Sequence, residues 1–104
     1  YTQDFAKTVK ALLEKRFWGL YNCVCQGLTS RLEVAQELLN ILGRNDEIKI
    51  NIVDSRYFKN EYFAERPASE RLITRKLDMR GVNMMREWKM ALREYVEQYY
   101  KGYL

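Results

Sequence analysis

The residues best suited to bind a ligand lie around the only proline of the chain, in the stretch ERPASERL. Proline disfavours the helical region for the residue before it, so we predict an extended backbone at Arg66. A guanidinium held on such a corner suits bidentate hydrogen bonding to a phosphate or a carboxylate. Ser69 follows three positions later and could donate a second hydrogen bond. The alternative interpretation is a corner that only shapes the loop.

The segment around this step is strongly basic. From position 66 to position 93, eight basic residues face three acidic ones, a net charge of +5 in a chain whose total is +4. One interpretation is a solvated charged surface, and the other is attraction of phosphate groups on a small ligand or on nucleic acid. The sequence lacks a helix-turn-helix signature, an RNP-type aromatic strand and zinc ligands. We therefore predict no nucleic-acid partner.

Catalytic motifs are missing from the sequence. The chain has no histidine, which removes His-based metal sites and a His general base, and leaves its serines without an activating imidazole. The glycines form neither a dinucleotide-binding loop nor a phosphate loop. Cys23 and Cys25 are predicted to be reduced thiols, which fits a cytoplasmic protein. We therefore predict no catalytic residue, no metal site and no cofactor site in this chain.

The elements that must position the arginine–proline step are predicted to be mixed helix and strand. Hydrophobic spacing predicts a helix over 2–16, and Ser30 with Glu33 forms a capping box that starts a second helix ending at Gly43. Short β-prone stretches at 19–25 and 47–53 flank that helix and predict strands. Strand, helix and strand with short connections predict a βαβ unit with a short parallel sheet. The fold class expected is therefore α/β, with flanking helices.

The second half of the chain is predicted to be a long surface segment over 54–70, a short helix near 74–80 and a last helix over 84–101. The length of 104 residues suits one small domain. No apolar run approaches the length of a membrane span, so we predict no membrane partner. The chain begins at Tyr1 rather than at a methionine, which suggests an excised domain, a processed chain or a trimmed one.

Four pieces of the chain, taken in order, resemble one family. They are YTQDFAKTVKALLE, GLYNCVCQGLTSRLEVAQELL, RPASERLITRKL and GVNMMREWKMALREYV. From Tyr1 to about Tyr99 they resemble the C-terminal, substrate-binding part of dTDP-4-dehydrorhamnose reductase, in the extended short-chain dehydrogenase/reductase superfamily. The resemblance implies that residues 1–104 form a single substrate-binding domain excised from a Rossmann-fold enzyme of dTDP-rhamnose biosynthesis.

The resemblance also implies roles for individual residues. Arg66 would contact the diphosphate region of a nucleotide-sugar, Ser69 occupies the next motif position, and Tyr1 matches a step near the domain junction. The family's Tyr-x-x-x-Lys catalytic pair and glycine-rich cofactor loop are absent here. NAD(P)H is therefore expected on an N-terminal Rossmann domain of the same protein. Many reductases of the family have Asn-Ser after Arg-Pro-Ala, whereas this chain has Ser69 and Glu70, and the charge of Glu70 beside a diphosphate leaves the particular sugar nucleotide open.

Three functions are carried forward. The first is the nucleotide-sugar-binding domain of an NAD(P)-dependent oxidoreductase that acts on a dTDP-4-keto-sugar. The second is part of a sugar-nucleotide epimerase or dehydratase, which the missing half would decide. The third is a free-standing basic interaction domain. The oligomeric state is left open by all three.

Overall fold

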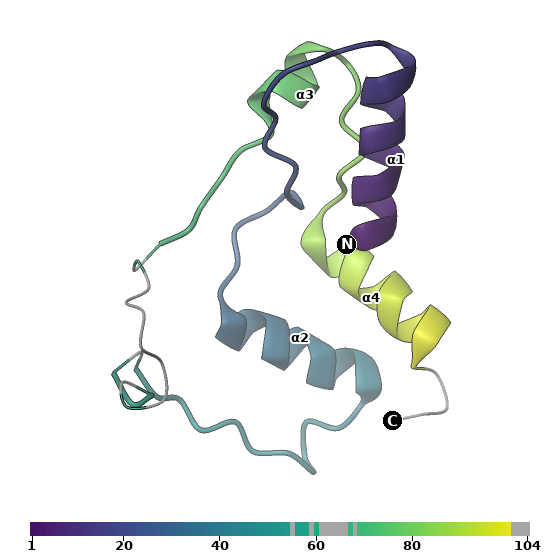
Figure 1. Cartoon of the computed structure of the whole chain (residues 1–104). Coiled ribbons are helices and arrows are strands. Elements are labelled where there is room, and N and C mark those ends of the chain that lie inside the picture. Colours follow the sequence, from purple (N-terminus) through teal and green to yellow (C-terminus); the bar gives the residue numbers. More distant parts are fainter. Residues whose placement is uncertain (55, 59, 61–66, 68, 101–104) are drawn as a thin grey trace. The chain divides into compact units, whose positions relative to one another are not determined.

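The described part of the computed structural model comprises residues 1–54, 56–58, 60, 67 and 69–100. It contains the helices α1 (Thr2–Glu14), α2 (Arg31–Leu42), α3 (Arg75–Met79) and α4 (Trp88–Tyr99) (Figure 1). The chain divides into two compact units. Unit 1 is Tyr1–Thr29 together with Leu72–Leu104 and holds α1, α3 and α4, whereas unit 2 is Ser30–Arg71 and holds α2.

The core of unit 1 is built by α3, the turn after it and α4. Its buried apolar residues are Leu77, Val82, Met85, Ala91 and Val96. Gly81 turns the chain after α3 with a left-handed backbone, φ +63°, and the Val82 N–H then donates to the Leu77 carbonyl at 3.1 Å. This tight turn joins Leu77 to Val82, and both side chains are fully buried in the core of unit 1.

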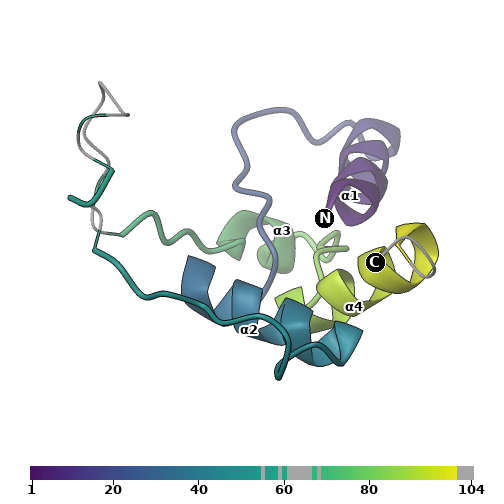
Figure 2. The same ribbon diagram turned by 90° about the horizontal axis from the view of Figure 1, so that it is seen from below.

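α1 packs on α4 in an unusual way. Figures 1 and 2 both show the first turn of α1 beside α4, and the Gln3 amide donates to the Tyr99 hydroxyl at 2.6 Å. The buried side chains of α1 are Asp4 and Thr8, whereas Phe5 and Leu13 on the predicted apolar stripe are about half exposed. The Thr8 hydroxyl donates to the Asp4 carbonyl at 2.9 Å, so burial leaves it hydrogen-bonded.

α2 forms as its sequence predicts. The Ser30 hydroxyl accepts from the Glu33 N–H at 3.2 Å, while the Glu33 carboxylate accepts from the Ser30 N–H at 2.6 Å. These two bonds satisfy donors that every helix start leaves without an intrahelical partner. Gly43 ends the helix with φ +67°. No helix within the described ranges is long and apolar enough to cross a bilayer.

The predicted α/β fold class is wrong for the part of the chain that the structure describes. No strand occurs there, and neither 19–25 nor 47–53 joins a ladder. Gln26 and Glu87 form an isolated parallel β-bridge. The alternation of Ile48, Ile50 and Ile52 marks a possible apolar face, but a strand also needs a neighbouring backbone. Ile52 is accordingly 74% exposed. Whether 1–104 acts as one domain stays a prediction.

Candidate functional site

The three residues predicted to contact substrate fall in different parts of the chain. Arg66 lies outside the described residues. Ser69 is described and exposed, and it belongs to unit 2. Tyr1 belongs to unit 1 and is half-buried. Their expected convergence on one ligand therefore stays a prediction.

Tyr1 sits on an ion-pair network that joins α1 to α4. The Arg86 guanidinium donates from Nε to Asp4 Oδ2 at 2.9 Å and from Nη2 to Asp4 Oδ1 at 3.0 Å. Its Nη1 donates to Glu94 Oε2 at 2.5 Å. The Tyr1 hydroxyl donates to the other oxygen of Glu94 at 3.2 Å, and its ring lies 5.7 Å from the guanidinium. Tyr1 is thus oriented by two charged neighbours.

The network shifts the pKa values of Arg86, Glu94 and Tyr1. Asp4 is 1% exposed, so its charge needs the bidentate contact from Arg86. The hydrogen bond from Arg86 holds the pKa of Glu94 below its usual value, and the bond to Glu94 is the largest cause of the raised pKa of Arg86. Desolvation, followed by the hydrogen bond to Glu94, raises the pKa of Tyr1. Tyr1 is therefore a neutral hydrogen-bonding side chain near neutral pH, with no general-base role.

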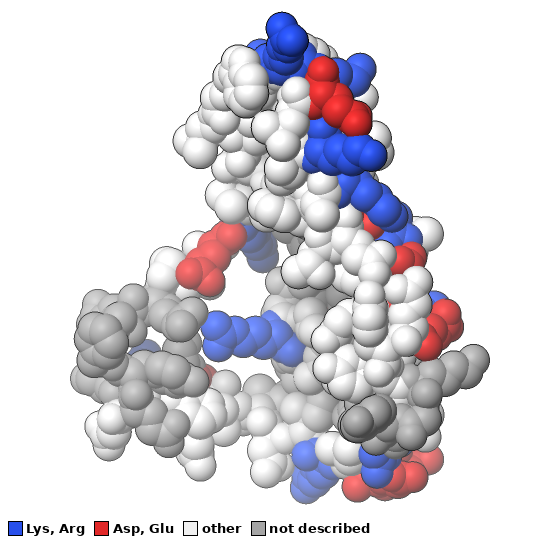
Figure 3. All heavy atoms as spheres, turned by 45° about the vertical axis from the view of Figure 1, so that its right-hand side comes forward, with Lys and Arg blue, Asp and Glu red and all other residues white. Residues whose placement is uncertain are grey.

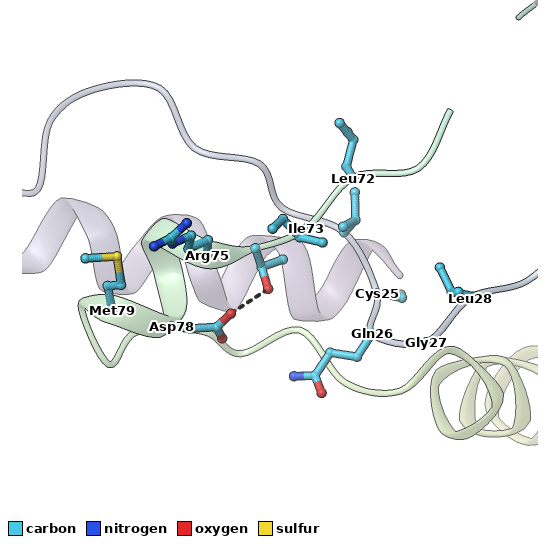
Figure 4. A pocket seen from close by; sticks show the side chains of 11 residues that line it. Cys25, Gln26, Gly27, Leu28, Leu72, Ile73, Arg75, Asp78 and Met79 are labelled. Carbon is cyan, nitrogen blue, oxygen red and sulfur yellow. Dashed lines mark hydrogen bonds between the residues drawn. The ribbon is translucent and has the colours of Figure 1, made fainter. Parts of the chain in front are cut away.

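A pocket of about 510 Å³ lies entirely within unit 1 (Figure 4). It is formed where the segment before unit 2 passes the segment after it. Apolar side chains, including Leu28, Leu72 and Ile73, form much of its wall. The full lining is Val24, Cys25, Gln26, Gly27, Leu28, Leu72, Ile73, Thr74, Arg75, Asp78 and Met79.

One wall of the pocket is fixed by the bridge to α4. The Gln26 N–H donates to the Arg86 carbonyl at 2.8 Å, and the Trp88 N–H donates to the Gln26 carbonyl at 3.1 Å. Gly27 follows with φ +88°, and a Cβ there would lie 3.0 Å from Trp88 Cδ1. Glycine is therefore required by both the backbone and the close approach of the indole. This wall is held by main-chain hydrogen bonds, so it is preformed.

The polar side of the pocket is a small network around α3. The Thr74 hydroxyl donates to Asp78 Oδ2 at 3.1 Å, the bond drawn in Figure 4. The Asn83 amide donates to Asp78 Oδ1 at 2.6 Å and to the Thr74 hydroxyl at 2.9 Å. Because Asp78 is occupied by these donors, its charge does not pair with the neighbouring Arg75. No carboxylate of the described residues forms an ion pair with Arg75. Its guanidinium can therefore donate hydrogen bonds to an anionic group of a ligand.

Arg75 is the candidate that the sequence left unmarked. It counted only as one of eight basic residues, because nothing in its local sequence resembles the fixed arginine–proline step. What sets it apart is its place in a pocket with apolar walls, and that place depends on residues about fifty positions earlier. Arg86, from the same basic segment, is instead occupied by two carboxylates. The basic segment therefore does not act as one surface.

The site can bind and orient a ligand. Cys25 lines the pocket and Cys23 does not, and burial raises the pKa of the Cys23 thiol, which keeps it protonated and a poor nucleophile. Cys23 and Cys25 are both free thiols. Among the described residues no group of three His, Cys, Asp or Glu side chains could hold a metal ion.

NAD(P)H does not fit the residues present. A dinucleotide fold binds pyrophosphate at an open helix start behind a glycine-rich loop. The start of α2 is closed by its own Glu33, and Asp4 lies in the first turn of α1. Glu87 fills the start of α4 by accepting from the Lys89 N–H at 2.8 Å. Glu33 and Glu87 would repel a pyrophosphate and Asp4 is buried, so the starts of α1, α2 and α4 offer no dinucleotide site.

A protein-family model described as the RmlD substrate binding domain matches residues 1–101. The match covers nearly the whole chain, including both units and the arginine–proline step. No curated protein and no solved structure matches closely enough to add to it.

Proposed function

Since the chain belongs to the RmlD substrate-binding domain family, we propose that it binds a dTDP-4-keto-sugar for an NAD(P)-dependent reductase. The family match over residues 1–101 is the observation that carries this proposal. It agrees with the four sequence pieces that resemble dTDP-4-dehydrorhamnose reductase. The hydride donor would be held by a Rossmann-type domain, because the residues of this chain do not fit the cofactor.

The chemistry of the ligand suggests which of its groups each residue would contact. A nucleotide-sugar carries a flat base, a polyhydroxy sugar and a diphosphate. The apolar-walled pocket with Arg75 at its edge suits an amphipathic group with a negative charge. Arg66, for which the sequence predicts an extended corner, would contact the diphosphate, and Ser69 would add a hydrogen bond. Tyr1, oriented by Arg86 and Glu94, would present its ring and hydroxyl to the ligand.

The proposal is tested by substrate affinity in the enzyme that carries this chain. Arg66→Ala should weaken binding of dTDP and of a dTDP-sugar by about tenfold or more, as expected for a lost charge-assisted hydrogen bond. The affinity for NAD(P)H should stay unchanged. Isothermal titration calorimetry measures both.

A matched control is Lys49→Ala, which removes one positive charge from an exposed position of unit 2. It should leave both affinities unchanged. Equal dTDP affinity in the wild type and in Arg66→Ala would refute the assigned role of Arg66. If the enzyme forms a 4-keto-sugar and does not reduce it when NAD(P)H is supplied, the epimerase or dehydratase alternative is favoured.

A further inference from the structure

The end of α1, the residues after it and the short helix α3 carry a surface that the proposed function uses only at Arg75 and Met79, which also line the pocket. The Arg80 guanidinium lies 4.4 Å from the centre of the Phe17 ring and 5.8 Å from that of Tyr21. The Lys76 ammonium lies 5.7 Å from the centre of the Tyr21 ring, and it donates to the Leu20 carbonyl at 3.0 Å. Residues 15–21 and α3 with Arg80 are therefore held together, and we call them the basic–aromatic tip.

The tip carries uncompensated positive charge. Apart from Arg75, which the proposed function assigns to the pocket, its cations are Lys15, Arg16, Lys76 and Arg80. None of them forms an ion pair with a carboxylate of the described residues. The two nearest acids in sequence are engaged elsewhere, since Glu14 pairs with Lys10 and Asp78 accepts from Thr74 and Asn83. Figure 3 shows Lys and Arg side chains gathered at the upper end of the view.

Arg16 is kept at a position where glycine would be favoured. Its φ is +54°, and among the described residues it is the only non-glycine with a positive φ. The structurally equivalent positions after α2 and α3 are Gly43 and Gly81, with φ +67° and +63°. A strained backbone is retained where its side chain is useful, and here that side chain adds a cation to the tip.

The tip also exposes large apolar side chains between these cations. Leu20 is 81% exposed, Met79 is 77% exposed and Trp18 is 71% exposed. In the sequence, Trp18 and Leu20 flank a glycine, and Met79 directly precedes Arg80. Protruding Trp, Leu and Met side chains among Lys and Arg are the composition that inserts into the headgroup region of a lipid surface.

We propose that the basic–aromatic tip docks on a surface of anionic lipids. Charge complementarity selects this occupant. A protein partner would place charge-depleted surface at its centre, whereas here Lys15, Arg16, Lys76 and Arg80 lie on the same segments as the exposed apolar side chains. Single-stranded nucleic acid needs several open aromatic faces for stacking, but cations lie over Phe17 and Tyr21, which leaves Trp18 as the one strongly exposed aromatic ring of residues 15–21. An anionic lipid surface satisfies both the charge and the apolar exposure.

The test is co-sedimentation of the full chain with vesicles of phosphatidylcholine, with and without phosphatidylserine. The chain should bind only the vesicles that contain phosphatidylserine, and added salt should release it. Lys15→Gln should lower the partition coefficient about fivefold, the usual contribution of one cation near such a surface. Trp18→Ser should lower it by a similar factor through lost apolar insertion. Both side chains are exposed, so circular dichroism should show an unchanged fold.

Lys49→Gln serves as the matched control, because it removes the same charge from an exposed position in unit 2. It should leave the partition coefficient unchanged. Absence of binding to phosphatidylserine vesicles would overturn the proposal. An equal loss for Lys49→Gln and Lys15→Gln would also overturn it, since binding would then follow net charge and not the tip. So would binding to a single-stranded oligonucleotide that Lys15→Gln weakens while vesicles are left unbound.

Discussion

Replacing Arg16 by glycine should stabilise the protein even though it removes a side chain. The two hydrogen bonds that end α1 run from the Arg16 N–H to the Leu13 carbonyl at 3.0 Å and from the Phe17 N–H to the Leu12 carbonyl at 2.9 Å. α2 and α3 end on the same pair of bonds, with a glycine at the left-handed position. Arg16→Gly therefore keeps every backbone contact of the motif and removes only the clash of Cβ.

The magnitude follows from two opposing effects. A left-handed backbone costs a residue with a Cβ about 1–2 kcal/mol relative to glycine. Glycine in turn loses about 0.4–1 kcal/mol more conformational entropy on folding. The net gain in the free energy of unfolding is about 0.5–1 kcal/mol, which raises the midpoint of thermal unfolding by roughly 2–8 °C in a domain of this size.

The assay is urea and thermal denaturation followed by circular dichroism, with two comparison variants. Lys15→Gly removes a similar charge from the preceding residue, whose φ of −84° is ordinary for any side chain. It should destabilise by about 0.5–1 kcal/mol, the usual cost of glycine in a helical turn. Arg16→Ala keeps the strain and should bring no gain. A stabilising Arg16→Ala would show that charge and not the backbone is responsible, and a destabilising Arg16→Gly would refute the reasoning.

Two further substitutions test the core and the ion-pair network. Leu77→Ala should lower the free energy of unfolding by about 2–5 kcal/mol in urea titrations, because Leu77 is fully buried, whereas the exposed Leu72→Ala should change it little. The pKa of Glu94 is depressed in the folded state, so its pair with Arg86 stabilises the protein fully above the pKa of an unfolded glutamate and loses this contribution as the pH falls through the depressed value. Unfolding midpoints measured across acidic pH should therefore drop less steeply in Glu94→Gln, and an unchanged slope would contradict the assigned pair.

Local signals in the sequence predicted the helices well. Ser30 and Glu33 formed the capping box expected of them, and Gly43 ended that helix. Both partners of these helix-capping interactions lie within one helical turn of each other. A short stretch of sequence is therefore enough to predict them. Hydrophobic spacing likewise placed α1 and α4 within a few residues of their observed bounds, and the short helix expected near 74–80 is α3.

Features that depend on distant partners were missed. The apolar alternation around Ile50 predicted a strand, but a ladder needs a second backbone that no local pattern supplies. The burial of Asp4 depends on its pair with Arg86, which lies 82 residues later. Arg75 becomes a candidate ligand contact only because Leu28 and Gly27 form the opposite wall of its pocket. Arg66 and Ser69 were found from their motif, and their convergence stays a prediction.

The division of the chain has a consequence for how its parts could be exchanged. Unit 1 is discontinuous, since residues 30–71 leave it after Thr29 and return at Leu72. The two exit points lie near each other, because Leu28 and Leu72 line the same pocket. The entropy of closing a loop grows only with the logarithm of its length, so replacing unit 2 by a linker a quarter as long would change that cost by only about 1 kcal/mol. The length of residues 30–71, which include the arginine–proline step, therefore has little effect on the loop-closure cost in unit 1. This makes the segment suitable for grafting between related proteins.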